Sequence, residues 1–279
     1  MNSIHTSKAI FSAQVRNKMP FFLGLLMVIS LTGTEAILPS ASASARTEFH
    51  EAAKGRRIVP PKHRAPPLIA AVNQEDIRPE HRVLADQVLR ALPPQCRDSL
   101  ESFYVNYDKN PSNRGLGGED TIIIAGAVPA KEFAALLIHE CGHVTDLGGI
   151  RGTSESGNSE FKDGNTPIYQ NDPSVNFYRI NWDSSVMRKK SAKEADFVSG
   201  YAMTDPFEDF SETFAFYALQ RAEFAKLAKK NAALKAKYEF METVVFGNVP
   251  PLGNGMYKRG TSAPWDVTRL PYVLLLLKN

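Results

Sequence analysis

The chain has 279 residues, of which 43% are hydrophobic and 23% are charged, and its formal net charge at pH 7 is +3. This length and composition allow a globular domain with a substantial core. The small net charge argues against a nucleic-acid-binding protein, and no basic stripe with interleaved aromatic residues supports one.

Residues 1–45 have the organisation of a secretory signal peptide. Three basic residues precede an apolar run at 21–31, and two A-x-A sequences follow it, at 41–43 and 43–45. The apolar run is about 11 residues long, too short for a membrane-spanning helix, which needs roughly 20. We therefore expect cleavage before Arg46 and a mature protein that is secreted or periplasmic. Removal of three positive charges and one negative charge lowers the net charge from +3 to about +1.

Residues 46–75 are expected to form a flexible linker. Basic residues alternate with two Pro-Pro pairs, and there are too few large apolar residues for a core. This composition favours a solvated tether. The alternative is a basic arm that docks on an anionic surface such as an envelope. From about residue 76 the composition is globular, so one domain is expected over 76–279.

The first part of this domain predicts one helix and a small sheet. Apolar residues at helical spacing predict a helix at 79–92, and two prolines end it. Residues 100–107 alternate weakly and are consistent with a strand, whereas the Asn, Pro and Gly residues of 108–118 predict a loop. The β-branched segment 121–125 is the strongest strand signal. It is either an edge strand that pairs with an extended peptide or a buried core strand.

His139, Glu140 and His143 form an H-E-x-x-H motif in a helix that begins near Pro129. Residues four apart share one face of a helix, which places the two histidines side by side as nitrogen ligands of one zinc ion. Glu140 is placed to act as a general base on a water at the metal. The helix is apolar on nearly every side and therefore buried, where ionisable residues need partners. This favours a metal site over a helix that carries two histidines by chance.

The segments after the motif carry weaker signals. Asp146, three residues after His143, either accepts a hydrogen bond from a ligand imidazole or is an ordinary polar residue near the helix end. Gly148 and Gly149 are expected to end the helix. Residues 150–176 are rich in Gly, Ser, Asn and Asp and predict a long loop. The aromatic segment 177–182 is expected to pack in the core, with a place along the cleft as the alternative.

A second helix is expected to begin at Asp205 and Pro206, which suit its N-cap and first position. Glu208 and Glu212 are four residues apart and share a face. Two carboxylates on a packed face are costly unless they meet a cation. One of them would complete three protein ligands and leave a fourth position open. The spacing alone does not distinguish the two, and Glu208 also fits a capping box without a metal role.

These two blocks resemble a known peptidase family. The motif with Asp146, and the later pattern Tyr-x6-Glu-x3-Glu-x-Phe that begins at Tyr201, are similar to the C-terminal peptidase domain of anthrax lethal factor and its bacterial relatives, which are zincin metallopeptidases. The resemblance covers roughly residues 120–225 and is strong only at the two blocks. It implies that Glu208 is the third zinc ligand and that Glu212 orients a ligand. It also implies that the phenol of Tyr201 stabilises the tetrahedral intermediate or protonates the leaving group.

Cys96 and Cys141 are the two cysteines of the chain. In an exported protein they are able to pair. Because Cys141 lies about 200° round the helix from His139, it faces the core, and a buried free thiol is the favoured interpretation. A disulfide, or a latency switch with the Cys96 thiolate on the zinc, are the alternatives.

The C-terminal region predicts further helix at 223–246, a loop at 247–264 and a final buried segment at 270–277, which is too short to span a membrane. The whole sequence thus predicts an α+β, zincin-like domain, mostly helical with a small sheet beside the H-E-x-x-H helix. The expected activity is exported, zinc-dependent hydrolysis of a peptide or protein substrate, with Glu140 as general base. A zinc-retaining but inactive binding or effector module is the alternative, and a helical structural protein without metal is a third. Nothing in the sequence indicates an oligomeric state.

Overall fold

The structure, a computed structural model, describes residues 66–277. The expected signal peptide and the part of the linker up to residue 65 lie outside this range. The rest of the expected linker belongs to the fold. The backbone N–H of Ile69 donates to Asp86, and Val72 is buried in the core. The ordered domain therefore starts before residue 76, because a short apolar segment packs on the first helix.

Helices predominate, and the sheets are small, in agreement with the expected α+β class. The helices are α1 Pro79–Ala91, α2 Pro94–Ser99, α3 Ala130–Val144, α4 Ser174–Asn181, α5 Pro206–Ala228 and α6 Ala232–Phe240. Two π-helical segments, Thr145–Gly149 and Met241–Phe246, extend α3 and α6. Short 3-10 turns lie at Ala70–Val72, Ser154–Ser156, Glu194–Asp196, Tyr201–Met203, Val267–Arg269 and Leu275–Leu277. The strands are β1 Ser102–Asn106, β2 Gly115–Gly117, β3 Thr121–Ala125, β4 Asn158–Asp163, β5 Thr166–Tyr169, β6 Trp182–Ser184, β7 Met187–Arg188, β8 Gly253–Gly255 and β9 Tyr272–Leu274.

The main sheet has the strand order β1-β3-β2, with β1 parallel and β2 antiparallel to β3. One expectation is corrected here, and one pair of alternatives is decided. The segment 121–125 is the central strand, so the core-strand alternative holds and the edge-strand alternative does not. The predicted loop 108–118 contains β2, which lies at the edge. A Gly-Leu-Gly sequence carries little strand propensity, so β2 exists through its backbone pairing with β3.

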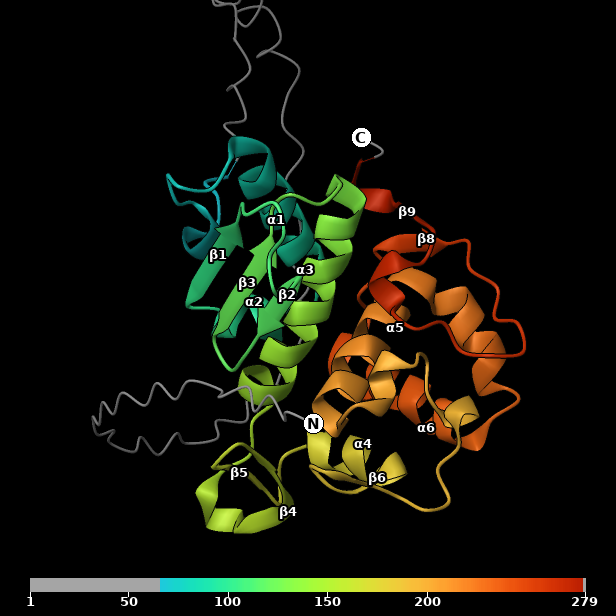
Figure 1. The fold of residues 1–279 in the computed structure, drawn as a ribbon. Coiled ribbons are helices and arrows are strands. Elements are labelled where there is room, and N and C mark those ends of the chain that lie inside the picture. The colour runs from blue at the N-terminus through green and yellow to red at the C-terminus, as the bar shows by residue number, and fades with distance from the viewer. Residues whose placement is uncertain (1–65, 278–279) are drawn as a thin grey trace, which may run out of the picture. The chain divides into compact units, whose positions relative to one another are not determined.

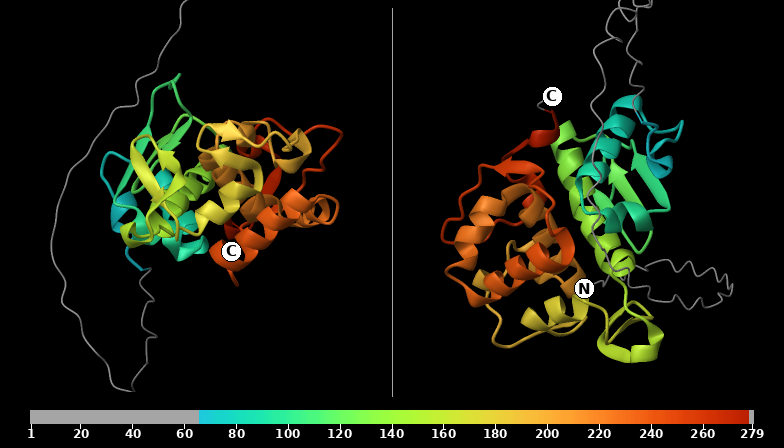
Figure 2. Two further views of the ribbon diagram at one scale, coloured as in Figure 1. Left: turned by 90° about the horizontal axis from the view of Figure 1, so that it is seen from below. Right: turned by 180° about the vertical axis from the view of Figure 1, so that it is seen from behind.

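The motif helix α3 lies between this sheet and the long helix α5, as Figures 1 and 2 show. One face of the sheet, with Phe103, Ile122 and Ile124, is buried, whereas Tyr104 and Leu116 are exposed on the other face. Every residue of α3 from Phe133 to Val144 is buried. The expectation of a buried helix is therefore confirmed, and its two sides face different parts of the fold.

A disulfide joins Cys96 of α2 to Cys141 of α3, with their Cα atoms 5.3 Å apart. The favoured sequence interpretation, a buried free thiol, is therefore wrong. The sequence did not predict α2, a single short helix after Pro93. This helix packs on α3 and brings Cys96 to the side of the motif helix away from the histidines. The disulfide fixes the motif helix to the N-terminal part of the domain.

The segment 150–176 is also not a structureless loop. It contains the antiparallel hairpin β4–β5, and Gly164 takes a positive φ of 55° in its turn. Phe161 of β4 is buried, with its ring centroid 5.0 Å from that of Tyr178. The aromatic segment 177–182 lies in the core, as expected. Within residues 66–277, every helix is too short or too polar to cross a bilayer.

Candidate metal centre

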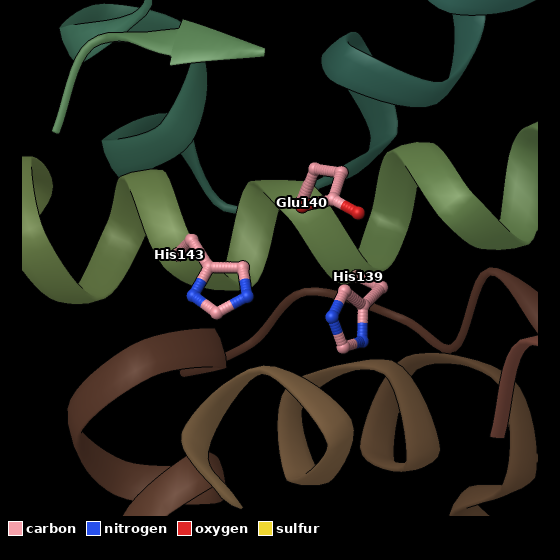
Figure 3. A group of neighbouring side chains, drawn as sticks. All are labelled: His139, Glu140 and His143. Atoms are coloured by element: carbon pink, nitrogen blue, oxygen red, sulfur yellow. The ribbon is translucent and has the colours of Figure 1, made fainter. Parts of the chain in front are cut away.

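The second half of α3 presents the three motif residues together. His139 and Glu140 are each 4% exposed, and His143 is 6% exposed. The two imidazole rings project side by side from one side of α3, as Figure 3 shows, with their centroids 5.2 Å apart. One potential ligand atom from each of the three residues lies within 4.8 Å of the others, so this buried group could hold a metal ion.

The first turn of α5 brings a carboxylate to the same place. Asp205 caps this helix, because its Oδ1 accepts the backbone N–H groups of Phe207 and Glu208 at 3.0 and 2.9 Å. Glu208 then directs Oε2 to within 3.2 Å of His139 Nε2 and 3.4 Å of His143 Nε2. Its side chain therefore faces the imidazoles and does not turn back to close a capping box with Asp205.

The two separations that involve Glu208 Oε2 fit a metal site. Ligands at about 2.0–2.2 Å from a tetrahedral ion lie roughly 3.3–3.6 Å from one another, and the measured distances from Glu208 Oε2 are 3.2 and 3.4 Å. Glu208 Oε2 is also buried, and within residues 66–277 it has no hydrogen-bond partner. A buried, unpartnered carboxylate oxygen is costly, and a cation held jointly with the two imidazoles would compensate it.

The imidazoles and carboxylates of this group shift one another's pKa values. Burial opposes protonation of His139, but the adjacent Glu208 and Glu212 outweigh it and raise the pKa of this imidazole well above its usual value. Burial favours the neutral form of Glu208, but His139 and His143 outweigh it and hold the pKa of Glu208 well below its usual range. Since metal ligands must be deprotonated, a metal that binds here would displace protons from the imidazoles.

The carboxylate of Glu140 lies against the edge strand β2. A Cβ atom on Gly115 would come within 1.9 Å of Glu140 Oε1, and one on Gly117 within 2.9 Å of Oε2. Gly115 and Gly117 pair with Ile124 and Ile122, so they occupy the rows of the sheet that face α3. The two glycines therefore leave the space that the carboxylate fills. Burial raises the pKa of Glu140, which suits a group that both accepts and returns a proton.

Tyr201 and Glu212 complete the surroundings. The hydroxyl of Tyr201 donates to Glu208 Oε1 at 3.0 Å, and its ring centroid is 6.1 Å from that of His139. Burial and the nearby Glu208 raise the pKa of Tyr201 well above its usual value, so the phenol stays protonated. Glu212 is fully buried, with Oε1 3.0 Å from His139 Nδ1, while its Oε2 accepts the backbone N–H of Val267 at 3.0 Å. Glu208 and Glu212 thus approach different nitrogens of one imidazole.

Of the two alternatives for Asp146, the structure does not show the hydrogen bond to a ligand imidazole. Asp146 Oδ1 accepts the hydroxyl of Tyr178 at 2.7 Å, and its Oδ2 has no hydrogen-bond partner among the described residues. Burial raises the pKa of Asp146 to about 8. The chain widens into a π-helical turn after Val144, and α4 supplies the tyrosine. Asp146 therefore joins α3 to α4, and its hydrogen bond is to a phenol and not to an imidazole.

Several supports of the site had no signal in the sequence. Arg114, the residue before β2, forms ion pairs with Glu132 of α3 at 2.6 Å and with Asp266 at 2.5 Å. Asp266 directly precedes Val267, whose N–H holds Glu212. This network joins the edge strand to the segment that holds Glu212, the neighbour of His139. Arg114 and Asp266 are 152 positions apart in the sequence. No local pattern predicts such a contact.

The structure brings both sequence blocks of the family resemblance to one place, the α3–α5 contact. His139, Glu140 and His143 come from the first block, and Tyr201 and Glu208 from the second. Comparisons of the chain with protein-family models, with curated proteins and with solved structures find no match.

Proposed function

We propose that this protein is a zinc-dependent metalloendopeptidase of the lethal-factor-like zincin type. One observation carries the proposal: Glu208 Oε2 lies 3.2 and 3.4 Å from the Nε2 atoms of His139 and His143, beside the buried carboxylate of Glu140. Two imidazoles and one carboxylate, with a fourth position open, form a donor set typical of catalytic zinc. Glu140 adds the general base that such hydrolysis requires.

Each residue of the site has its own role in the proposed hydrolysis. A zinc ion bound there would supply Lewis-acid chemistry to the scissile carbonyl and to water. Glu140 accepts the proton of the attacking water and returns it to the leaving amine. The protonated phenol of Tyr201 donates a hydrogen bond to the oxyanion that develops on the carbonyl. Glu212 restrains the ring of His139 through Nδ1.

The edge strand supports an extended peptide as the substrate. Among the described strands, β2 pairs only with β3, which leaves the other side of its backbone free. An extended chain adds to such an edge through main-chain hydrogen bonds. Because Gly115 and Gly117 also contain the carboxylate of Glu140, a peptide paired with β2 would lie close to the general base. If residues 1–45 act as the expected signal peptide, this reaction would take place outside the cytoplasm.

The first test is the metal content of the purified chain from Arg46, measured by mass spectrometry beside a Glu208→Ala variant. The proposal expects about one zinc per chain in the wild type and loss or strong weakening in the variant. A wild-type chain without zinc would overturn it. Zinc retained equally by Glu208→Ala would remove this carboxylate from the ligand set.

The second test is hydrolysis of a mixed peptide library, with products identified by mass spectrometry. Glu140→Gln should keep zinc and lose hydrolysis, because the amide cannot accept the proton. Cleavage by this variant at the wild-type rate would contradict the mechanism. A wild type that holds zinc and cleaves no peptide would instead indicate the zinc-retaining binding module.

A further inference from the structure

Trp265 is an exposed aromatic residue next to the metal centre. Of the two tryptophans, Trp182 is buried and donates its indole N–H to Asp209, whereas Trp265 is 71% exposed. Single exposed apolar residues are common on proteins and need no special explanation. The position and the backbone of Trp265 distinguish it from such residues.

The backbone around Trp265 is held on several sides. The N–H of Gly200 donates to the carbonyl of Pro264 at 2.7 Å, and the N–H of Tyr201 donates to the carbonyl of Trp265 at 2.8 Å. Two residues later, the N–H of Val267 donates to Glu212 at 3.0 Å. The segment that carries the indole is thus attached both to the tyrosine of the site and to the carboxylate that supports His139.

The indole itself lies against the same turn. A Cβ atom on Gly200 would come within 2.7 Å of Trp265 Cε3, so the glycine allows this close approach. The ring centroid of Trp265 is 6.3 Å from that of Tyr201, which is in turn 6.1 Å from that of His139. A large apolar surface is therefore held one aromatic ring away from a candidate metal ligand, although the fold does not bury it.

We propose that Trp265 is a specificity-determining residue that contacts an apolar side chain of the peptide substrate next to the scissile bond. This inference rests on the proposed peptidase function. The exposed indole favours large apolar side chains, aromatic ones above all, since aromatic rings pair with an indole and bury much surface. Its attached backbone keeps the ring in place before the substrate arrives, so binding loses little conformational freedom.

The test uses the zinc-loaded protein and the best peptide substrate of the wild type. Each position from three residues before to three residues after the scissile bond is replaced in turn by Phe, Leu, Ala, Ser or Glu, and kcat/KM is measured. The wild type should prefer Phe or Leu over Ser at one position by about 10-fold or more. Trp265→Ala should lose this preference at that position alone, and Trp265→Phe should keep part of it. Met187→Ala, which removes an apolar side chain that is 55% exposed on β7, should leave the pattern unchanged.

A binding measurement provides the second readout. In the zinc-loaded Glu140→Gln variant, a peptide with the preferred apolar residue should reduce the quenching of tryptophan fluorescence by acrylamide, since Trp265 is the accessible indole. The same peptide with Ser should reduce it much less. A uniform loss of kcat/KM in Trp265→Ala, an unchanged preference, or unchanged quenching would overturn the proposal while hydrolysis by the wild type upholds the peptidase function. A wild type that cleaves no peptide would remove both.

Discussion

Replacement of Gly115 by alanine tests the proposed role of Glu140 as general base without touching a proposed metal ligand. The new Cβ would lie 1.9 Å from Glu140 Oε1 and 2.8 Å from its Cδ, whereas real Cβ contacts essentially never fall below 3.0 Å. The carboxylate must therefore move by at least about 1 Å. The end of a flexible side chain can make this movement, so the strand and α3 are not forced apart.

The expected effect follows from that displacement. A misplacement of about 1 Å at a reacting group costs on the order of 100-fold in rate. Such a loss corresponds to about 2.7 kcal/mol of transition-state stabilisation. Zinc content should be unchanged, because the three atoms nearest to a Cβ at residue 115 all belong to Glu140. The free energy of unfolding should change by no more than about 1 kcal/mol.

The assay compares kcat/KM, zinc per chain and urea unfolding for Gly115→Ala and a matched control. Gly118→Ala is that control, because a Cβ at residue 118 meets no atom of the described residues within 4 Å and its φ is not positive. The control should retain wild-type activity. If zinc-loaded Gly115→Ala also hydrolysed peptides at the wild-type rate, the reaction would not use the observed position of the Glu140 carboxylate.

Three further predictions concern stability. Burial raises the pKa of Asp146 to about 8, above its unfolded value, so its contribution is fully present at acid pH and is lost as pH rises through 8. The metal-free wild type should lose up to about 4 kcal/mol of unfolding free energy between pH 5 and 8, and Asp146→Asn should flatten that slope in urea titrations; equal slopes would refute this. Replacing both Cys96 and Cys141 by Ala should cost about 2–4 kcal/mol, and insensitivity of wild-type stability to reductant would contradict it. Lys237→Met should cost about 3–5 kcal/mol in thermal unfolding, because Asp209 stays buried without its 2.7 Å partner, and a change below about 1 kcal/mol would exclude this.

The two helices that carry the candidate metal ligands could be predicted from the sequence because their signals are local. The four-residue spacing of His139 and His143 and the apolar surroundings of the motif predicted a buried helix with a two-histidine face. Asp205 and Pro206 fixed the start of α5, and the cap is present. Once both helices are in place, Glu208 needs only the α3–α5 contact to meet the imidazoles.

The features that the sequence did not predict depend on tertiary pairing. Residues 115–117 have the composition of a loop and form an edge strand only because their backbone pairs with that of β3. The pairing of Cys96 with Cys141 depended on α2, which is too short for a periodic signal. The bond between Glu212 and the N–H of Val267 spans 55 positions and uses a backbone group, which has no sequence signature.

Glycines that pack on the two sides of α3 should affect different properties of the site, which gives a final test. Gly142, inside the motif, faces α5, and a Cβ there would come within 2.7 Å of Ser211 Cα, a backbone atom that cannot rotate away. Gly142→Ala should therefore push apart the helices that carry the histidines and the glutamates. Zinc affinity should fall by about 10-fold or more, and stability by about 1–3 kcal/mol. Gly115→Ala should instead lose activity at full zinc content. If Gly142→Ala bound zinc as tightly as the wild type, the α3–α5 spacing would not set the ligand geometry. The structural argument that Glu208 is a zinc ligand would then fail.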